Sequence, residues 1–228
     1  MASPLVRGVL TLALVGATAL PVSAQRRELA LTMAATYTGA TGPLLEKTSG
    51  KVGFMAGIQL RLPRSARFSF QSEFLVVHRR LIGERAPSTL PPTLVGPEAD
   101  FARLTYLEVP LMLRFQRSYS QDAPVRPFLV VGPSVSVRIG CSREIRESAT
   151  VVRSATCREP GFAPALYQDL DVAIQFGGGI EFRRVALSIR GTRSFRNLVD
   201  PSALPTSPFD GAKLWSVFAG VDVMARWF

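Results

Sequence analysis

The sequence contains little histidine, cysteine or lysine. Among 228 residues there are one histidine, two cysteines and three lysines. Zinc sites in proteins are built mainly from cysteine and histidine ligands, three or four to a site, so a zinc centre is improbable here. After residue 24, no run approaches the roughly 18 consecutive apolar residues of a membrane-spanning helix. The sequence therefore offers neither a zinc centre nor a helical anchor beyond its N-terminal stretch.

Residues 1–24 are the one long apolar stretch. They contain a single basic residue, Arg7, then an apolar run, and they end in Val-Ser-Ala. This pattern is typical of a secretory signal with a small-x-small cleavage site. An uncleaved membrane helix is the alternative, but the apolar run is too short for it. We predict a signal peptide over 1–24 and an exported domain over 25–228.

The charge is strongly basic, with 27 Lys+Arg against 17 Asp+Glu and a net charge of +10. Loss of Arg7 with the signal peptide leaves 26 basic residues and a net charge of +9. A nucleic-acid protein usually gathers its basic residues on one patch or helix, whereas these arginines are spread over strand ends and over one phase of the strands. We therefore expect no nucleic-acid partner. Arginine binds phosphate with two hydrogen bonds, so the strand-end residues Arg79, Arg80 and Arg85 are candidates for lipopolysaccharide phosphates; a solvated rim is the alternative.

The C-terminal stretch from Leu214 to Phe228 has the clearest pattern. Alternate side chains of a β-strand point to opposite faces. Here one phase is apolar with an indole at each end, and the other phase is mixed and charged. A membrane-spanning strand needs about 9–11 residues and carries aromatic residues at the membrane surfaces. The two phases are Trp215, Val217, Ala219, Val221, Val223, Ala225 and Trp227, and Ser216, Phe218, Gly220, Asp222, Met224 and Arg226.

Eight segments show this period of two, which is typical of β-strands. They cover about 29–37, 52–62, 67–79, 104–116, 128–140, 169–183, 185–195 and 214–228. The connections alternate between long and short, as in outer-membrane barrels with short periplasmic turns and long extracellular loops. We therefore predict an all-β fold, an eight-stranded antiparallel transmembrane β-barrel with both termini on the periplasmic side. A secreted, lipocalin-like soluble barrel is the alternative fold.

The expected connections can be given as ranges. The long loops are about fourteen residues after the first segment, then 82–100, 141–168 and 196–212, and the shorter turns are 63–66, 117–125 and one near Arg184. Pro110 and Pro133 lie inside strand segments, where proline removes a ladder donor, so we expect bulges or strand ends there. The run Gly177–Gly179 predicts a sharp bend or a crowded interior.

The two cysteines, Cys141 and Cys157, lie sixteen positions apart in one predicted loop. Export to an oxidising compartment favours a disulfide between them. On chain-entropy grounds it would stabilise the loop by about 3 kcal/mol. Two free thiols are the alternative.

Charged residues recur in the phase that we expect to face the barrel interior. An eight-stranded barrel has an interior just wide enough for side chains, and buried charges must be paired. We therefore expect a plug of paired charges; a narrow polar path or small-ligand site is the alternative. The network that we predict is Glu73, Glu108, Arg114, Glu181, Arg190, Asp222 and Arg226, and the same phase also holds Arg61, Arg138, Asp171 and Arg183.

His78 and the pair Asp169 and Asp171 are also candidates for a site, but we expect a functional site at neither. His78 shares the phase of the apolar residues at the outer end of its segment, where a structural role is expected and a His–Ser catalytic pair across strands is the alternative. Asp169 and Asp171 supply only two carboxylates, whereas calcium takes six or more oxygen ligands. We expect no catalytic residue, no metal site and no cofactor.

Several short motifs occur in a consistent order along the chain. They are Tyr106–Leu111, Arg126–Phe128 with Gly132–Ser134, Gly177–Phe182, and Ile189-Arg190 with Phe195–Leu198. In this the chain resembles the PorT-like outer-membrane β-barrel family, one of the outer membrane protein beta-barrel domain groups. Gly191 departs from the pattern, because that family commonly has tyrosine after the arginine.

The resemblance implies a barrel, an outer-membrane location and insertion by the barrel-assembly machinery, and it implies no single activity. Family barrels usually place a terminal Phe in the lipid-facing phase. Here Trp227 has that phase and Phe228 is one residue out, so we expect these two residues to form the insertion signal in a shifted register.

We expect a monomeric, non-enzymatic outer-membrane protein that supports the envelope or binds through its loops. A narrow channel or small-solute porin is the first alternative, and a lipid-modifying outer-membrane enzyme is the second. Loop residues carry such functions in barrels, and the sequence does not identify a ligand.

Overall fold

The computed structural model describes residues 28–43, 45–65, 67–85, 99–117, 125–147, 150–156, 167–199 and 211–226. The predicted signal peptide over 1–24 and the insertion signal Trp227 and Phe228 lie outside the described residues. Within the described ranges, no helix is long and apolar enough to cross a membrane.

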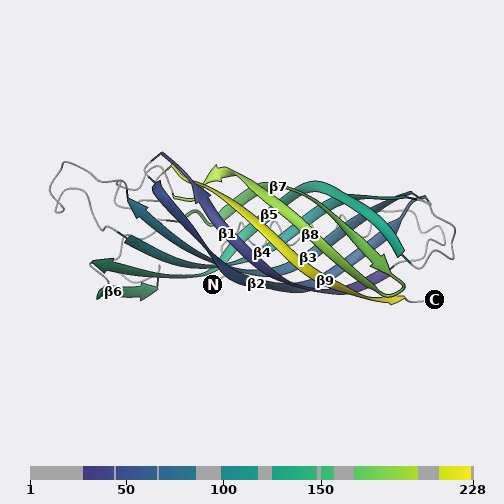
Figure 1. The fold of residues 1–228 in the computed structure, drawn as a ribbon, viewed down its shortest axis with the longest axis horizontal. Coiled ribbons are helices and arrows are strands. Elements are labelled where there is room, and N and C mark those ends of the chain that lie inside the picture. The colour runs from purple at the N-terminus through teal and green to yellow at the C-terminus, as the bar shows by residue number, and fades with distance from the viewer. Residues whose placement is uncertain are drawn as a thin grey trace.

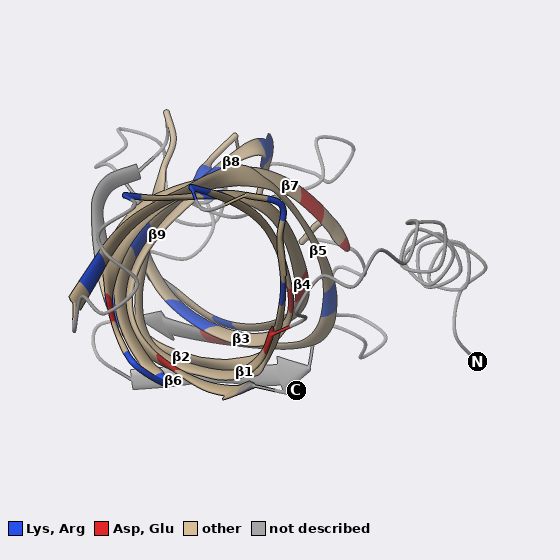
Figure 2. Cartoon of the chain, turned by 90° about the vertical axis from the view of Figure 1, so that its right-hand side faces the viewer, with Lys and Arg blue, Asp and Glu red and all other residues tan. Residues whose placement is uncertain are grey.

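The described chain forms a single antiparallel sheet that closes on itself (Figures 1 and 2). Its strands are β1 (Glu28–Thr41), β2 (Leu45–Pro63), β3 (Phe68–Arg85), β4 (Ala99–Gln116), β5 (Val125–Glu147), β6 (Thr150–Thr156), β7 (Leu170–Phe182), β8 (Val185–Asn197) and β9 (Lys213–Arg226).

The sheet closes through one additional pairing. The strand order is β4-β3-β2-β1-β9-β8-β7-β5-β6, and β4 also pairs with β5. The barrel wall therefore has eight strands, while β6 pairs only with the end of β5 and forms a hairpin beyond the wall. The predicted eight-stranded antiparallel barrel is confirmed. Around the wall the order is β1, β2, β3, β4, β5, β7, β8 and β9, so strands four steps apart face each other across the lumen.

The two ends of the barrel differ in their connections. One end, here called the turn end, carries the connections 64–67, 117–124 and 183–184, together with Glu28 and Arg226 at the chain ends of the wall. The other end, the loop end, carries the hairpin β5–β6 and the remaining connections (Figure 1). Both wall termini thus lie at the turn end, as the even strand count requires.

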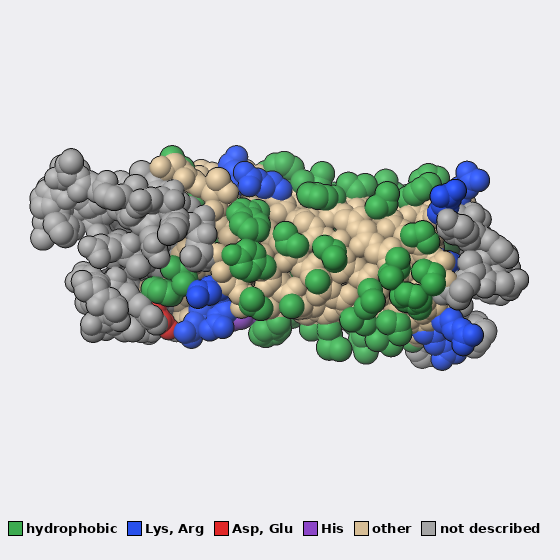
Figure 3. Space-filling model, in the orientation of Figure 1, with side chains coloured by type: hydrophobic (Ala, Val, Ile, Leu, Met, Phe, Trp, Pro, Cys, Tyr) green, Lys and Arg blue, Asp and Glu red, His purple; other side chains and the backbone are tan. Residues whose placement is uncertain are grey.

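The period of two places apolar side chains outside and polar ones inside. In β8 the burial alternates strictly, with Leu187 and Ile189 exposed and Ser188 and Arg190 buried. Across the wall the exposed residues are large and apolar, such as Met33 at 62% exposure. Figure 3 shows these apolar side chains over the middle of the barrel and basic side chains near both ends.

Aromatic residues flank the apolar band. At the loop end the rings of Tyr37 and Trp215 lie 5.8 Å apart, and at the turn end Phe68 and Phe115 lie 5.1 Å apart. Trp215 also covers Gly39, where an added Cβ would lie 2.5 Å from the indole. Aromatic residues are enriched where lipid meets water, so these pairs mark the two borders of the band.

The loops are shorter than the sequence suggests because several strands run beyond the membrane-length segments. Only residues 42–44 separate β1 from β2, so the prediction of a fourteen-residue loop is wrong. The predicted loop 141–168 likewise contains the end of β5 and all of β6. Residues 148–149 and 157–166 of that loop lie outside the described residues.

The two strand prolines produce no bulge. The β3–β4 ladder skips the pair Glu73–Pro110, and the β4–β5 ladder skips Leu111–Pro133, yet neither register shifts there. A missing N–H donor thus interrupts the ladder without displacing it, and the prediction of bulges at these prolines is wrong. The irregularity between β4 and β5 lies at Thr105/Tyr106 instead.

The glycine run in β7 lies against a crowded interior. A Cβ on Gly177 would lie 2.7 Å from the Cα of Arg190, and a Cβ on Gly179 would lie 2.7 Å from the ring of Phe128. Glycine at these positions leaves room for two large side chains that fill the lumen.

Candidate functional site

The lumen at the turn end is organised around Glu181 of β7. This carboxylate accepts hydrogen bonds from Arg61 at 2.8 Å and from Arg114 at 2.6 Å, and it forms an ion pair with Arg126 at 3.0 Å. Arg61 also pairs with Glu28 at 2.9 Å. The guanidinium of Arg114 lies 3.4 Å from the ring centroid of Phe128, an arrangement that favours a cation–π contact.

The middle of the lumen is organised around Arg190 of β8, which is 1% exposed. It donates to Glu73 of β3 at 2.6 Å and lies 3.6 Å from the carboxylate of Asp222. Gln71 donates to Glu73, and Thr32 donates to Asp222 at 2.9 Å. One buried cation is therefore shared between two carboxylates, each held by a neutral neighbour.

The third group lies nearer the loop end and is organised around Arg79 of β3. Arg79 donates to Glu108 at 2.7 Å and lies 3.7 Å from Asp171. Gln175 donates to Glu108, and Ser194 donates to Asp171. We call these three groups the charge tiers; their buried charges are Arg61, Arg79, Arg114 and Arg190 against Glu73, Glu108, Asp171, Glu181 and Asp222.

Two of the ion pairs cross the lumen from one side to the other. Arg190 and Glu73 come from β8 and β3, and Arg61 and Glu181 come from β2 and β7. Each of these strand pairs is four steps apart in the eight-stranded wall. The side chains thus connect opposite walls of the barrel.

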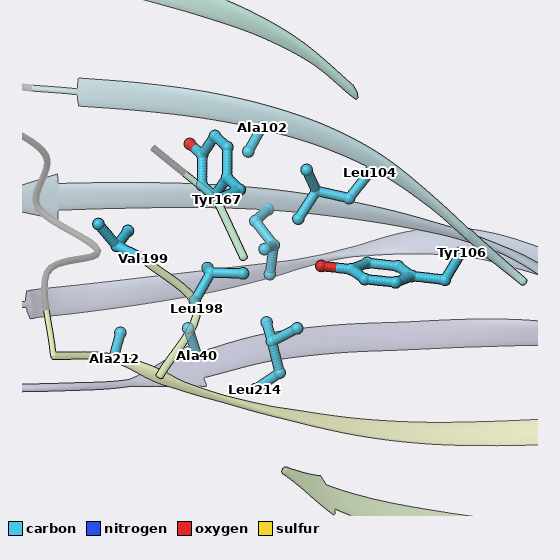
Figure 4. Packing of buried hydrophobic residues seen from close by; sticks show 10 residues of the cluster. Ala40, Ala102, Leu104, Tyr106, Tyr167, Leu198, Val199, Ala212 and Leu214 are labelled. Carbon is cyan, nitrogen blue, oxygen red and sulfur yellow. The ribbon is translucent and has the colours of Figure 1, made fainter. Parts of the chain in front are cut away.

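An apolar cluster, here called the cap, fills the lumen at the loop end above Tyr106 (Figure 4). The ring of Tyr106 also lies 4.9 Å from the guanidinium of Arg79, so it joins the cap to the charge tiers. The cap consists of Ala40, Leu81, Ala102, Leu104, Tyr106, Tyr167, Leu198, Val199, Ala212 and Leu214.

Segments outside the strands hold the cap in place. Tyr167 and Val199 form an isolated β-bridge, the N–H of Gln168 donates to the carbonyl of Leu198 at 3.0 Å, and the N–H of Leu198 donates to Ala212 at 2.6 Å. The chain before β7, after β8 and before β9 is thereby joined on one side of the mouth, where these three strands are neighbours.

Between the cap and the upper charge tier lies a cavity of about 10 Å³, lined by residues that include Asp171, Ser194 and Leu214. That volume accommodates about one water molecule. Several buried polar atoms of the tiers have no protein partner, among them both amide atoms of Gln59 and the Nε and Nη1 atoms of Arg114. Buried polar groups of this kind are usually satisfied by water, so these positions are suited to single waters.

The structure places six of the seven residues of the predicted interior network in the lumen. Glu73 pairs with Arg190, and Arg114 pairs with Glu181. Glu108 pairs with Arg79, and Asp222 lies near Arg190. Arg226 belongs to β9, but its side chain lies outside the described residues.

Other charged residues differ from expectation. The prediction of Arg79 at the outer rim is wrong, because it is 2% exposed inside the lumen. The inward assignment of Arg183 is also wrong, because this exposed residue lies in the β7–β8 turn with φ of 45°. Arg138 instead pairs with the exposed Asp169 at 2.5 Å. Arg126 is missing from the predicted interior charges, because its position just inside β5 carries no period-two signal that separates it from a turn residue.

His78 lies on the outer face of β3 between two cross-strand neighbours. Its Nδ1 atom lies 3.1 Å from the hydroxyl of Thr105, and its ring stacks on Phe54 at 5.3 Å. The His–Ser pair considered from sequence is thus a His–Thr pair. In the part of the chain that the structure describes, no group of three or more His, Cys, Asp or Glu residues could hold a metal ion.

Cys141 is disulfide-bonded and packs against the cap. In the β5–β6 hairpin the neighbouring residue Ser142 lies opposite Thr156. Cys157 itself lies outside the described residues, and the pairing of the two stays a prediction.

Comparison with solved structures finds small outer-membrane barrels at low identity. The chain has 8% identity to the outer membrane protein OprG from Pseudomonas aeruginosa, with a TM-score of 0.45, and the match covers 89% of this chain and 97% of that one. For Neisserial surface protein A the identity is 13%, the TM-score 0.44 and the coverage 86% and 96%. For Ail of Yersinia pestis the identity is 10% and the TM-score 0.43, and the match covers 88% of this chain and 99% of that one.

No curated protein matches the chain. A family model described as "Outer membrane protein beta-barrel domain" matches residues 25–200, which is more than half of the chain. The narrower PorT-like resemblance is not established by this match. With its closed barrel, its apolar outer band and this match, the chain belongs to the outer membrane protein beta-barrel domain family and is an outer-membrane protein.

Proposed function

We propose that this protein is a non-conducting, non-enzymatic outer-membrane barrel that acts through the surface of its loop end, as a binding or envelope-supporting protein. The observation that carries the proposal is the set of paired charges and buried apolar side chains inside the lumen. Arg190–Glu73 and Arg61–Glu181 connect opposite walls, and the cap occupies the mouth above them. A barrel with such contents has its accessible chemistry on its ends and outer wall.

The proposal includes an orientation. Both wall termini and connections of two to eight residues lie at the turn end, whereas the longer connections 86–98 and 198–212 lie at the loop end. Outer-membrane barrels carry short turns on the periplasmic side and long loops outside. We therefore propose that the loop end, with the hairpin β5–β6, is extracellular. We also propose that the protein is a monomer, that it is inserted by the barrel-assembly machinery, and that outer-membrane lipid and lipopolysaccharide surround it.

The test is single-channel recording. The chain without residues 1–24 is refolded in detergent, its folding is verified by a heat-modifiable shift on an SDS gel, and it is added to planar bilayers, with a general porin as the positive control. We expect flat current traces over many insertions. Reproducible step currents from heat-modifiable protein would overturn the proposal.

A narrow path for water or a very small solute is the second candidate. The observation in its favour is the set of buried polar atoms without a protein partner, which includes atoms of Gln59, Arg61 and Arg114 along the lumen. Liposome swelling with glycerol-sized solutes distinguishes the two functions, because a filled barrel gives no swelling above that of empty liposomes.

The non-enzymatic part of the proposal depends on His78. Its side-chain partner is the hydroxyl of Thr105, and no carboxylate among the described residues binds its ring. A hydrolytic His-hydroxyl pair would need a group that orients the histidine. Expression in a host with ordinary lipid A should leave the acyl chains intact; a loss of acyl chains that His78→Ala abolishes would show an enzyme.

A further inference from the structure

Three basic residues lie opposite one another on adjacent strands near the loop end. Lys51 of β2 pairs in register with Arg80 of β3, and Arg80 pairs with Arg103 of β4. All three side chains are exposed. We call these residues the cation row, and Figure 3 shows basic side chains gathered beside a histidine in this part of the surface.

The row places like charges at cross-strand positions, where Cβ atoms are about 5 Å apart and like charges destabilise a sheet. Arg103 pairs with Glu144 at 2.9 Å and remains 46% exposed. Among the described residues, no carboxylate pairs with Lys51 or with Arg80. The row therefore carries more positive than negative charge and favours an anion that can contact two or three of its members.

The surface next to the row changes step by step toward the middle of the barrel. The adjacent cross-strand set is Phe54, His78 and Thr105, in which the two rings stack. The set after that is Ala56, Val76 and Leu107, which belongs to the apolar band. The cation row thus lies at the border of that band, where a ligand would meet cations first and apolar side chains next.

A bulge lies at the same place. The β2–β3 register shifts between Lys51 and Phe54, and bulges re-aim the side chains beside them. Val52, within the bulge, is 64% exposed, so an apolar side chain stands directly beside the cations.

We propose that the cation row binds the phosphate of a membrane lipid, with the acyl chains of that lipid lying on Phe54 and Val76. Arg80 and Arg103 bind the phosphate oxygens, since guanidinium groups match phosphate with paired hydrogen bonds, and Lys51 adds a third positive charge. The ligand class is a phosphorylated glycolipid or phospholipid of the leaflet at the loop end. The inference rests on the proposed function, because it uses the outer wall at the loop end as the binding surface.

The barrel supplies a matched control. Arg193 of β8 is also exposed near the loop end, but its register partners are Ile174 and Trp215. It has the same charge, and it has no cation opposite it. Loss of Arg193 removes one positive charge without changing the row.

The experiment measures the binding of diphosphoryl lipid A to the refolded barrel in a zwitterionic detergent by calorimetry. We expect Arg80→Gln to weaken binding about tenfold, the effect of losing one charge-assisted contact, and Arg193→Gln to change it less than twofold. Equal losses in the two variants, or no binding to the wild type, would overturn the proposal. Each variant is first shown to fold by its heat-modifiable gel shift.

Two further probes identify the source of the phosphate. Dephosphorylated lipid A should bind about tenfold or more weakly, and inorganic phosphate alone should bind weakly and compete only at high concentration. If inorganic phosphate binds as tightly as lipid A, the row is a free-anion site and the lipid assignment is wrong. If dephosphorylated lipid A binds equally well, contact with the apolar band alone accounts for binding.

Stability gives an independent measurement. Without lipid, Arg80→Gln should unfold at the same or a higher urea concentration than the wild type, because like-charge repulsion in the row is removed. With lipid A, the wild type should gain more stability than the variant, since a ligand stabilises only the form that it binds. These readouts do not involve conductance: a barrel that conducts but binds lipid A contradicts only the proposed function, and a silent barrel that does not bind contradicts only this inference.

Discussion

The two parts of the lumen are filled by different kinds of side chain. Toward the loop end the cap is almost wholly apolar, whereas farther along the lumen the buried charges of the tiers lie among two smaller apolar clusters. An apolar filling needs only close packing, because its atoms have no partners to lose. A charged filling needs every partner in place, because a buried charge without one is costly.

The two parts should therefore differ in how much stability they lose when a side chain is removed. In the cap, loss of a side chain leaves a void, and the neighbours can close part of it. In the tiers, loss of Arg190 leaves Glu73 and Asp222 buried without their cation. The cap should therefore lose stability in proportion to the volume removed, while the tiers should respond to the loss of single charges.

Arg190→Ala should have the largest effect. We expect a loss of about 3–5 kcal/mol in the free energy of unfolding, because one partner of a buried ion pair is removed. The measurement is urea unfolding in lipid vesicles. The control is Glu73→Leu with Arg190→Met, which removes both charges of the 2.6 Å pair at similar volume and leaves only Asp222 without its cation. It should recover part of the loss; a double variant as unstable as the single one contradicts this account.

Val221→Arg should have the next largest effect, and it extends the comparison to the outer wall. Val221 is exposed between Met33 and Leu187 on the neighbouring strands. An arginine at mid-membrane on the lipid face costs about 2–4 kcal/mol, although four arginines are accommodated inside. The free energy of unfolding is measured after refolding in lipid vesicles, with Val221→Leu as the control. A Val221→Arg variant as stable as the wild type would refute the assignment of this face to lipid.

Leu198→Ala should cost about 2 kcal/mol, at the low end of the range for buried leucine, since the cap lies at the mouth of the barrel and can relax. The charge tiers below it remain intact, so the variant should also stay silent in planar bilayers. Unfolding and conductance are measured on the same preparation. Step currents in this variant would show that the cap alone closes the lumen.

Cys141→Ser should have the smallest effect on the barrel wall, within about 0.5 kcal/mol, because β6 pairs only with β5 beyond the wall. The predicted bond to Cys157 instead stabilises the hairpin. Limited proteolysis should cleave the hairpin faster in the variant while the wall stays protected. Equal cleavage rates would contradict the disulfide.

The sequence could predict the wall but only part of its contents. Period-two alternation is a local signal, so the strands and the inward charges such as Glu108 and Asp222 can be identified without tertiary information. Arg79 could have been assigned correctly, since it shares the phase of Glu73, but its adjacency to Arg80 suggests a rim position. Leu198 and Tyr167 lie outside the strands, and their packing depends on contacts between distant segments, so no periodic pattern identifies the cap.

The ion pairs that cross the lumen also bear on the order of folding. Arg61 and Glu181 are 120 positions apart in the chain, and Arg190 and Glu73 are 117 apart. Such pairs form only when β1 has met β9 and the ring is complete, after the entropy of closing long loops has already been lost. Much of the stabilisation is thus gained in the final closing step, so we expect slow, all-or-none folding in which no partly assembled sheet is stable.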